Sequence, residues 1–157
     1  MGVGIIVPRV SSSRLIAASP ETLWDLMSSI ELRPQWDLSV SQFDRSGPGH
    51  DLANIRLRYR APLIAGLFWE WEGAYVTYRP PRRTAVQMLN GSRLRPFKRL
   101  AGSWILKAER GGTHLELVVL FESRLPFVAR LMSPFIRRVL ERSLVRLEKL
   151  AYSPGGA

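Results

Sequence analysis

The spacing of the apolar residues changes twice along this 157-residue chain. It is helical after residue 19, alternates every second position between residues 38 and 124, and is helical again from 128 to 150. Consecutive strand patterns joined by short turns predict an antiparallel meander, because strands adjacent in sequence then pair in space. One sheet and one long amphipathic helix must each bury an apolar face. The sequence therefore predicts a curved antiparallel sheet wrapped around a long C-terminal helix.

Turn-forming residues divide the strand region into six segments. A first strand at residues 9–19 precedes them and alternates polar with apolar side chains. Pairs such as Asn90-Gly91 and Gly111-Gly112 mark turns between the later segments. The later strands are expected at residues 38–45, 54–61, 67–78, 84–89, 100–109 and 113–124. The fold class is thus α+β, with about seven strands in one sheet.

Proline positions set the predicted helix boundaries. Ser19 can cap a helix that begins at Pro20, and the pattern continues to Ile30. Pro34 interrupts it, so residues 31–37 are expected to add at most a short second helix. Near the C-terminus, Pro134 is expected to break or kink the helical pattern, and the favoured interpretation is a helical turn at 127–132 followed by a long helix at 134–152. We expect one domain over residues 1–157, with a core at about 9–152 and short tails.

The formal net charge of +10 is concentrated in one stretch. Residues 79–110 contain nine basic side chains and one acidic side chain. A basic patch attracts phosphate-bearing partners, and peripheral contact with an anionic membrane or with RNA is therefore one prediction. A solvated face is the alternative. The patch centres on Arg79, Arg82, Arg83, Arg93, Arg95, Lys98 and Arg99.

Several classes of chemistry lack their residues. The chain has no cysteine, which excludes disulfides, thiolate metal sites and a cysteine nucleophile, and suits a reducing compartment. His50 and His114 have no partner at metal-ligand spacing. No Gly-x-Ser-x-Gly elbow or Gly-rich phosphate loop occurs, and no uncharged stretch is long enough to span a membrane. We therefore expect no metal, no cofactor, no transmembrane segment and a cytoplasmic location.

One acidic pair and one apolar loop have competing interpretations. Glu70 and Glu72 share a face of a predicted strand and could act as an acid–base pair. The arginines at positions 56, 58 and 60 are expected opposite them, which favours an exposed ladder of ion pairs. Residues 63–68 form an apolar loop between charged strands. This loop is expected to cap a cavity mouth or to enter a membrane interface, and the two interpretations are compatible because a loop at the entrance can also contact a bilayer.

Aromatic residues gather on the predicted inner face of the sheet. Core packing is one interpretation, but several Trp and Tyr tips in one interior need hydrogen-bond partners, which a ligand can supply. We expect the gap between a strongly curved sheet and a single helix to form a cavity for an apolar ligand. Its predicted lining comprises Trp36, Tyr59, Trp69, Trp71, Tyr75, Gln87, Trp104, Leu117, Phe121, Phe135, Ile136 and Leu140.

Three segments resemble a known family. Residues 16–26 (IAASPETLWDL), followed by Pro34-Gln35-Trp36, are similar to the opening of the polyketide cyclase/dehydrase and lipid-transport group of the START/Bet v 1-like (SRPBCC) superfamily. Residues 102–106 (GSWIL) and 112–117 (GTHLEL) also fit, and the resemblance runs from about Val10 to Leu150. It implies a helix-grip fold and binding of sterols, lipids, quinones, plant hormones or polyketides. It transfers no catalytic residues, because the shared motifs are mostly structural.

Three functions stay open at this point. The first is binding, with transport or presentation, of a hydrophobic small molecule such as a lipid, a quinone or a polyketide-like ring system. The second is a cyclase or dehydratase acting in the same cavity, although no catalytic constellation is visible. The third is a basic module that docks on RNA, a ribosome or an anionic membrane.

Overall fold

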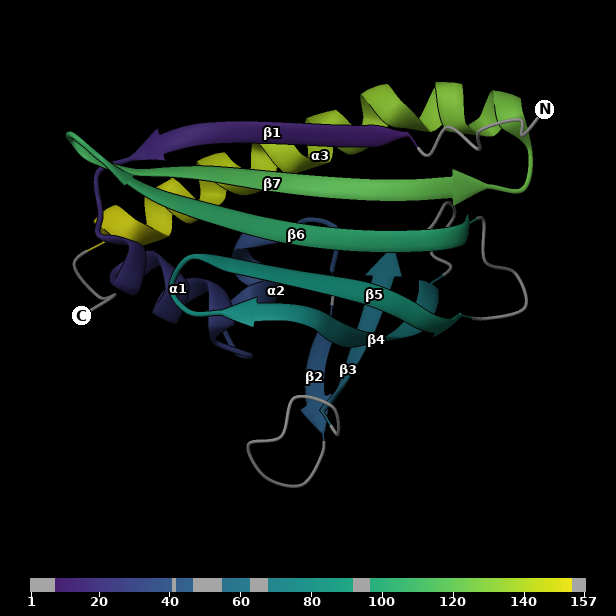
Figure 1. Cartoon of the computed structure of the whole chain (residues 1–157), viewed down its shortest axis with the longest axis horizontal. Helices are drawn as coiled ribbons and strands as arrows, with labels where there is room; N and C mark the ends of the chain where they lie inside the picture. The colour runs from purple at the N-terminus through teal and green to yellow at the C-terminus, as the bar shows by residue number, and fades with distance from the viewer. Residues whose placement is uncertain (1–7, 41, 47–54, 63–67, 92–96, 154–157) are drawn as a thin grey trace.

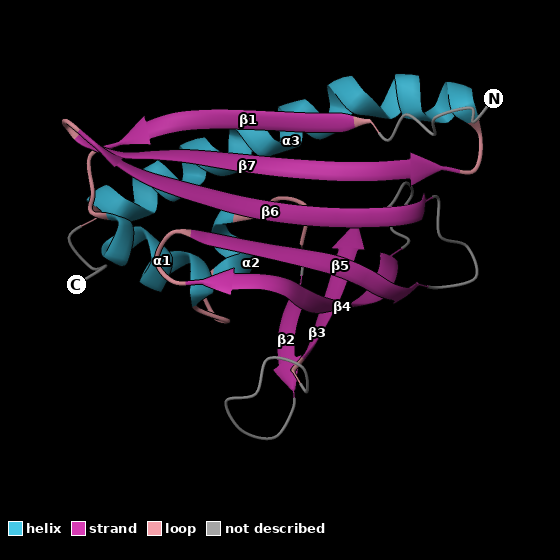
Figure 2. Ribbon diagram, in the orientation of Figure 1, coloured by secondary structure: helices cyan, strands magenta, loops and turns pink. Residues whose placement is uncertain are grey.

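The computed structural model describes residues 8–40, 42–46, 55–62, 68–91 and 97–153 (Figure 1). One seven-stranded antiparallel sheet has the strand order β1-β7-β6-β5-β4-β3-β2. Two short helices and one long helix accompany it, as Figure 2 shows by colour. The strands are β1 (Arg9–Ile16), β2 (Gln42–Ser46), β3 (Arg56–Pro62), β4 (Phe68–Arg79), β5 (Arg83–Gly91), β6 (Phe97–Glu109) and β7 (Gly112–Ser123). The helices are α1 (Pro20–Ser28), α2 (Arg33–Trp36) and α3 (Pro126–Tyr152). The predicted α+β architecture is confirmed.

The connections explain how the sheet closes on the helices. From β2 to β7, strands that are consecutive in sequence pair with each other, whereas β1 pairs with β7. Strand β1 therefore lies at one edge of the sheet, beside the last strand. Helices α1 and α2 follow β1 and lie at the end of the sheet where α3 finishes (Figure 1). Helix α1 begins as predicted, because the Ser19 Oγ accepts a hydrogen bond of 3.1 Å from the Thr22 backbone N–H.

Two strands are shorter than the spacing predicts. Strand β1 ends at Ile16 because the backbone N–H of Ala18 donates to the carbonyl of Ile16 and turns the chain. Strand β2 begins only at Gln42, since Val40 N–H donates to the Asp37 carbonyl in another turn.

On the outer surface, Arg58 and Arg60 lie 3.4 and 3.8 Å from Glu72 and Glu70. The predicted ladder of ion pairs is therefore confirmed at these two rungs.

The prediction of a break at Pro134 is wrong. Helix α3 runs without interruption from Pro126 to Tyr152, with Pro134 inside it. Proline removes one backbone donor, but Pro134 is exposed, so water can satisfy the carbonyl of Arg130 four residues earlier. None of the helices in the described ranges combines the length and apolar character that a bilayer crossing requires.

The hydrophobic core consists of two clusters. The larger one joins α1 and the second half of α3 to β1, β6 and β7, and it includes Leu23, Leu115 and Leu147. The smaller one lies on β2 and β3 and includes Phe43, Leu57 and Tyr59. Trp71 on β4 packs against both clusters. The side chains of the candidate functional site meet at the boundary between the two clusters.

Candidate functional site

Strand registers place the predicted aromatic residues on one face. Trp104 on β6 lies directly opposite Thr84 on β5 and Leu117 on β7. Directly opposed residues of antiparallel strands point to the same side of a sheet. Helix α1 covers this side, because the Trp24 ring contacts the Trp104 ring edge-on at 6.2 Å between centroids. Trp104 therefore marks the inner face.

The inner aromatic rings form two contacting groups. Trp36 from α2 meets Trp104 edge-on, with 5.8 Å between ring centroids. Tyr59 on β3 stacks on Trp71 of β4, with 4.0 Å between centroids and 10° between the ring planes. Edge-on and stacked pairs of this kind add stabilisation beyond burial alone. The two groups lie on the two sides of the boundary between the core clusters.

A buried ion pair occupies the space between these two groups. Arg33 and Asp37 are only 8% and 7% exposed, and the Arg33 Nε lies 2.7 Å from the Asp37 Oδ2. The Arg33 guanidinium carbon lies 4.7 to 5.8 Å from the centroids of four aromatic rings, a distance at which cation–π attraction acts. The four rings belong to Trp36, Phe43, Tyr59 and Trp104.

Sequence reasoning misses this pair. The pattern at residues 31–37 predicts only a short helix and assigns neither charge a role. The available signal is the spacing of four residues between Arg33 and Asp37, which places opposite charges on one helix face. The adjacent Trp36 indicates that this turn of helix enters the core. Spacing alone, however, does not distinguish a buried ion pair from an exposed one.

Two tyrosines near the ion pair are held in their protonated form. Burial raises the pKa of the Tyr59 hydroxyl well above its usual range, and the Arg33 charge opposes this rise only in part. Burial also raises the pKa of the Tyr75 hydroxyl, which Arg45 opposes. A tyrosine at its ordinary pKa is already protonated at neutral pH, and the upward shifts extend that form further into the alkaline range, so each phenol can donate a hydrogen bond.

Two buried polar atoms beside Trp104 have no hydrogen-bond partner among the residues that the structure describes. The Trp36 Nε1 belongs to a fully buried side chain, and the Thr84 Oγ1 to a side chain that is almost fully buried. Neither atom has a hydrogen-bond partner within the described part of the chain. Buried donors without acceptors are rare, since each costs about 1–3 kcal/mol. Both residues neighbour Trp104, so both orphaned atoms belong to one region of the interior.

Few described atoms pack against the middle of the inner face. Among the residues that the structure describes, leaving out chain neighbours, a Cβ built on Gly102 would meet only the backbone oxygen of Val118, at 4.0 Å. By contrast, a Cβ on Gly73 would meet Val86 Cγ1 at 2.7 Å. Further apolar side chains that pack on the larger cluster are only half-buried, and they come from both the sheet and α3. Five of them are Leu100, Trp104, Val119, Met132 and Ile136.

The predicted lining residues separate into three groups. Nine lie on or against the inner face, buried or half-buried: Trp36, Tyr59, Trp71, Tyr75, Trp104, Leu117, Phe121, Ile136 and Leu140. The Trp69 side chain lies outside the described residues. Gln87 and Phe135 are exposed, and neither faces the interior.

These two exceptions have physical reasons. Gln87 pairs with Ala74 and Ala101, so it occupies the outer face of the sheet, opposite to its neighbour Val86. Phe135 is 64% exposed because it directly precedes Ile136 on α3, and consecutive residues of a helix point about 100° apart. Strand alternation and helix geometry therefore remove both residues from the proposed lining.

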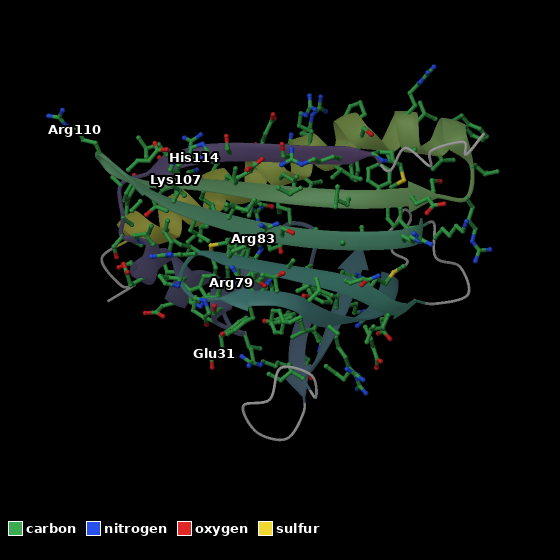
Figure 3. The ribbon with its side chains drawn as sticks, in the orientation of Figure 1. Glu31, Arg79, Arg83, Lys107, Arg110 and His114 are labelled. Carbon is green, nitrogen blue, oxygen red and sulfur yellow. The ribbon has the colours of Figure 1, made fainter. Side chains whose placement is uncertain are left out.

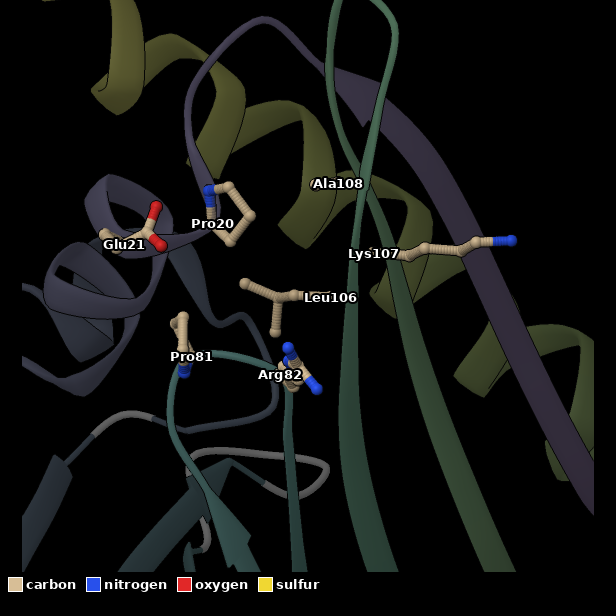
Figure 4. Close-up of a pocket in the computed structure, with 7 residues that line it drawn as sticks. All are labelled: Pro20, Glu21, Pro81, Arg82, Leu106, Lys107 and Ala108. Atoms are coloured by element: carbon tan, nitrogen blue, oxygen red, sulfur yellow. The ribbon is translucent and has the colours of Figure 1, made fainter.

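A hollow of about 390 Å³ lies outside this interior, between the start of α1, the turn after β4 and the end of β6 (Figure 4). Its lining mixes the prolines Pro20 and Pro81 with charged residues such as Arg82 and Lys107. It contains none of the aromatic residues described above. Among the described residues, no group of three or more His, Asp or Glu side chains could hold a metal ion.

The predicted basic patch does not form one surface in the described residues. Arg79, Arg82 and Arg83 are exposed at the turn between β4 and β5, and Figure 3 shows Arg79 and Arg83 toward the same end as Lys107. The first residues of β6 lie at the opposite end of the sheet (Figure 1). Lys98 and Arg99 in that segment lie 3.2 and 3.6 Å from Glu122. Arg93 and Arg95 lie outside the described residues, as do residues 63–67 of the predicted apolar loop and His50.

With this geometry in hand, comparison with known proteins identifies the family. A family model described as polyketide cyclase/dehydrase and lipid transport matches residues 7–151. The chain belongs to this family. Among curated proteins, none gives a significant match to the sequence.

Solved structures of the same architecture confirm the fold of this polyketide cyclase/dehydrase and lipid transport family member. The Zhui aromatase/cyclase from Streptomyces sp. R1128 is 17% identical, with a TM-score of 0.73 over 97% of this chain and 100% of that chain. TTHA0849 from Thermus thermophilus is 24% identical, with a TM-score of 0.69 over 90% and 95%. A START superfamily protein from Mycobacterium smegmatis is 20% identical, with a TM-score of 0.65 over 90% and 92%. The helix-grip fold is therefore established.

Proposed function

We propose that this protein binds a hydrophobic small molecule, such as a lipid, a quinone or a polyketide-like ring system, between the inner face of the sheet and α3. The observation that carries the proposal is the space above Gly102 in the middle of β6, where only the Val118 backbone oxygen, among described residues other than chain neighbours, comes within 4.0 Å of a built Cβ. Protein interiors are close-packed, so a glycine on an inner face normally has neighbours within contact distance. Half-buried apolar side chains on both the sheet and α3 support the same interpretation.

The polar atoms of the interior favour a ligand that carries a carbonyl or another hydrogen-bond acceptor. The Trp36 Nε1 can only donate, and it has no acceptor among the described residues. Apolar burial would supply most of the affinity, at about 25 cal/mol per Å² of apolar surface. A single acceptor placed against Trp36 would fix the orientation of the ligand.

A cyclase or dehydratase activity is the second candidate. The protonated Tyr59 and the buried Arg33 charge could polarise a ligand carbonyl, which is one requirement of aldol chemistry. A general base is harder to assign, because both carboxylate oxygens of Asp37 already accept hydrogen bonds from Arg33 and Ser39. This engagement favours binding over catalysis. The cyclase proposal predicts turnover of a synthetic poly-β-carbonyl thioester that Tyr59→Phe abolishes.

Substitution of Gly102 tests the binding proposal directly. Gly102→Leu places a branched side chain in this space, whereas Ala101→Leu adds similar bulk to the outer face of the same strand. We expect lipid extracts of the purified protein to contain a bound species by mass spectrometry. We also expect quinones or fatty acids from a small panel to raise the melting temperature. Gly102→Leu should abolish both signals, and Ala101→Leu should preserve them.

Two results would contradict the binding proposal. One is the absence of any co-purified molecule together with no thermal shift across the panel. The other is equal ligand binding by the wild type and by a folded Gly102→Leu variant. Circular dichroism and the melting temperature without ligand establish that each variant is folded, so loss of binding is separated from loss of structure.

A further inference from the structure

The first half of α3 carries large apolar side chains on its outer side. Phe127, Leu131 and Phe135 are 63%, 72% and 64% exposed. A spacing of four residues places them along one helix face. Leu125, immediately before the helix, is also exposed. These four residues are called the α3 stripe below.

The α3 stripe lies away from the core. Met132 and Ile136 on the same half of the helix pack against the larger cluster, and Leu140, Leu144 and Leu147 continue that buried face. In Figure 1 the first turns of α3 project past the sheet beside β1, the edge strand. Single exposed apolar residues are common on protein surfaces and need no explanation. A contiguous stripe of large apolar side chains is uncommon and marks an interaction surface.

The charge along the first half of α3 is positive as far as residue 140. Residues 124–140 contain four arginines and no acidic residue. All four arginines are exposed, and none forms an ion pair with a residue in the described ranges. Three of them, Arg130, Arg137 and Arg138, line one shallow surface hollow together with Ser133, Pro134 and Glu141. The second half of α3 differs, since it contains both acidic and basic side chains.

We propose that residues 124–138 dock on the surface of a bilayer that contains anionic lipids. Phe127, Leu131 and Phe135 would enter the interface between headgroups and acyl chains, and the arginines would contact lipid phosphates. The positive charge argues against a second copy of this chain as the occupant, because two copies of this surface would repel each other. This surface is distinct from the two membrane contacts that the sequence predicts, which are the basic side chains of Arg79–Arg99 and the apolar loop at residues 63–68.

Vesicle sedimentation tests the apolar part of the proposal. We expect the purified full chain to sediment with vesicles of phosphatidylcholine and phosphatidylglycerol, and to bind vesicles of phosphatidylcholine alone about tenfold less well. The triple variant Phe127→Gln, Leu131→Gln, Phe135→Gln should lower binding to the mixed vesicles by about tenfold or more. A matched control, Leu15→Gln with Val76→Gln, removes exposed apolar side chains from the sheet and should bind like the wild type.

Charge substitutions on the same helix complete the test. Arg130→Gln with Arg137→Gln should weaken binding to the mixed vesicles several-fold, whereas Arg142→Gln with Arg146→Gln, exposed on the second half of α3, should have little effect. All positions are exposed, so the variants should keep the wild-type melting temperature.

Equal binding to both vesicle types, or no effect of the triple variant, would overturn the proposal. A concentration-dependent dimer that the triple variant abolishes, without vesicle binding, would overturn it in favour of self-association. Ligand binding is measured separately and does not enter these outcomes.

Discussion

Arg33 and Asp37 place two opposite charges among aromatic rings, and a double-mutant cycle measures their coupling. Asp37→Leu leaves the guanidinium without its carboxylate, so we expect a loss of about 3–5 kcal/mol in the free energy of unfolding. Arg33→Met should cost less, because Ser39 still donates to Asp37. The double variant should be more stable than Asp37→Leu alone. Urea unfolding of the four proteins gives these values, and additive losses would show that the two charges do not interact.

Tyr59 makes stability depend on pH in the alkaline range. Burial raises its folded-state pKa, so the folded protein holds the phenolic proton more tightly than the unfolded chain. The resulting stabilisation is fully present below about pH 10, where the unfolded tyrosine titrates, and is lost as the pH rises further. We expect this decline to be shallower in Tyr59→Phe, by up to about 1.4 kcal/mol per pH unit. Chemical unfolding at a series of pH values measures it, and parallel curves for the two proteins would contradict the assignment.

At the scale of single residues, alternation predicts the face and says little about environment. It correctly places Trp104 and Leu117 on the inner face, because strand side chains alternate regardless of their surroundings. The same rule applied to Val86 and Met88 excludes Gln87, whose polarity alone suggests a place in the lining. The burial of Arg33 escapes sequence reasoning for a different reason: it depends on Phe43 and Tyr59, which come from strands later in the sequence.

Glycine substitutions in the hairpin between β6 and β7 test how closely this hairpin must approach β1. Gly112 has a φ of +147°, and a Cβ there would overlap the carbonyl of Ile16 in β1. Gly111 has a φ of +93°, but a Cβ built there has no described atom within 4 Å apart from its chain neighbours. Gly112→Ala should therefore destabilise the protein by about 3 kcal/mol or more, and Gly111→Ala by about 1–2 kcal/mol. Thermal unfolding measures both, and equal losses would show that the contact with β1 carries no cost.

Element boundaries depend on hydrogen bonds that the spacing of apolar residues does not encode. The start of α1 is predicted correctly, because its cap is local: Ser19, Pro20 and Thr22 are close in sequence. The end of β1 and the start of β2 are displaced from their predicted positions by backbone turns. The predicted helix break at Pro134 is wrong because packing on both sides of an exposed proline maintains the helix, and local propensity does not include that packing.

The order of elements makes the whole fold predictable. A meander has few ways to bury its inner face, and one long helix is the only element large enough to cover it. The proposed ligand space between sheet and helix is a different matter, because it depends on how closely α3 approaches residues such as Gly102 and Val119. No residue pattern encodes that distance, and the sequence predicts this space only from the size of the sheet.

The distribution of charge over the molecule limits how many basic side chains one RNA molecule can contact. In the described residues, Arg79, Arg82 and Arg83 lie at one end of the sheet, whereas Lys98 and Arg99 lie at the other and neighbour Glu122. A single-stranded RNA bound by three arginines should lose affinity with salt at a log–log slope of about −2, since each contact contributes roughly −0.7. Fluorescence anisotropy with a labelled RNA measures this slope. Replacing Arg79, Arg82 and Arg83 by Gln should remove the binding, and replacing Lys98 and Arg99 should change it little. A slope of about −3.5, with losses from both variants, would instead mean that the two ends contact one RNA and that the basic side chains act as a single surface.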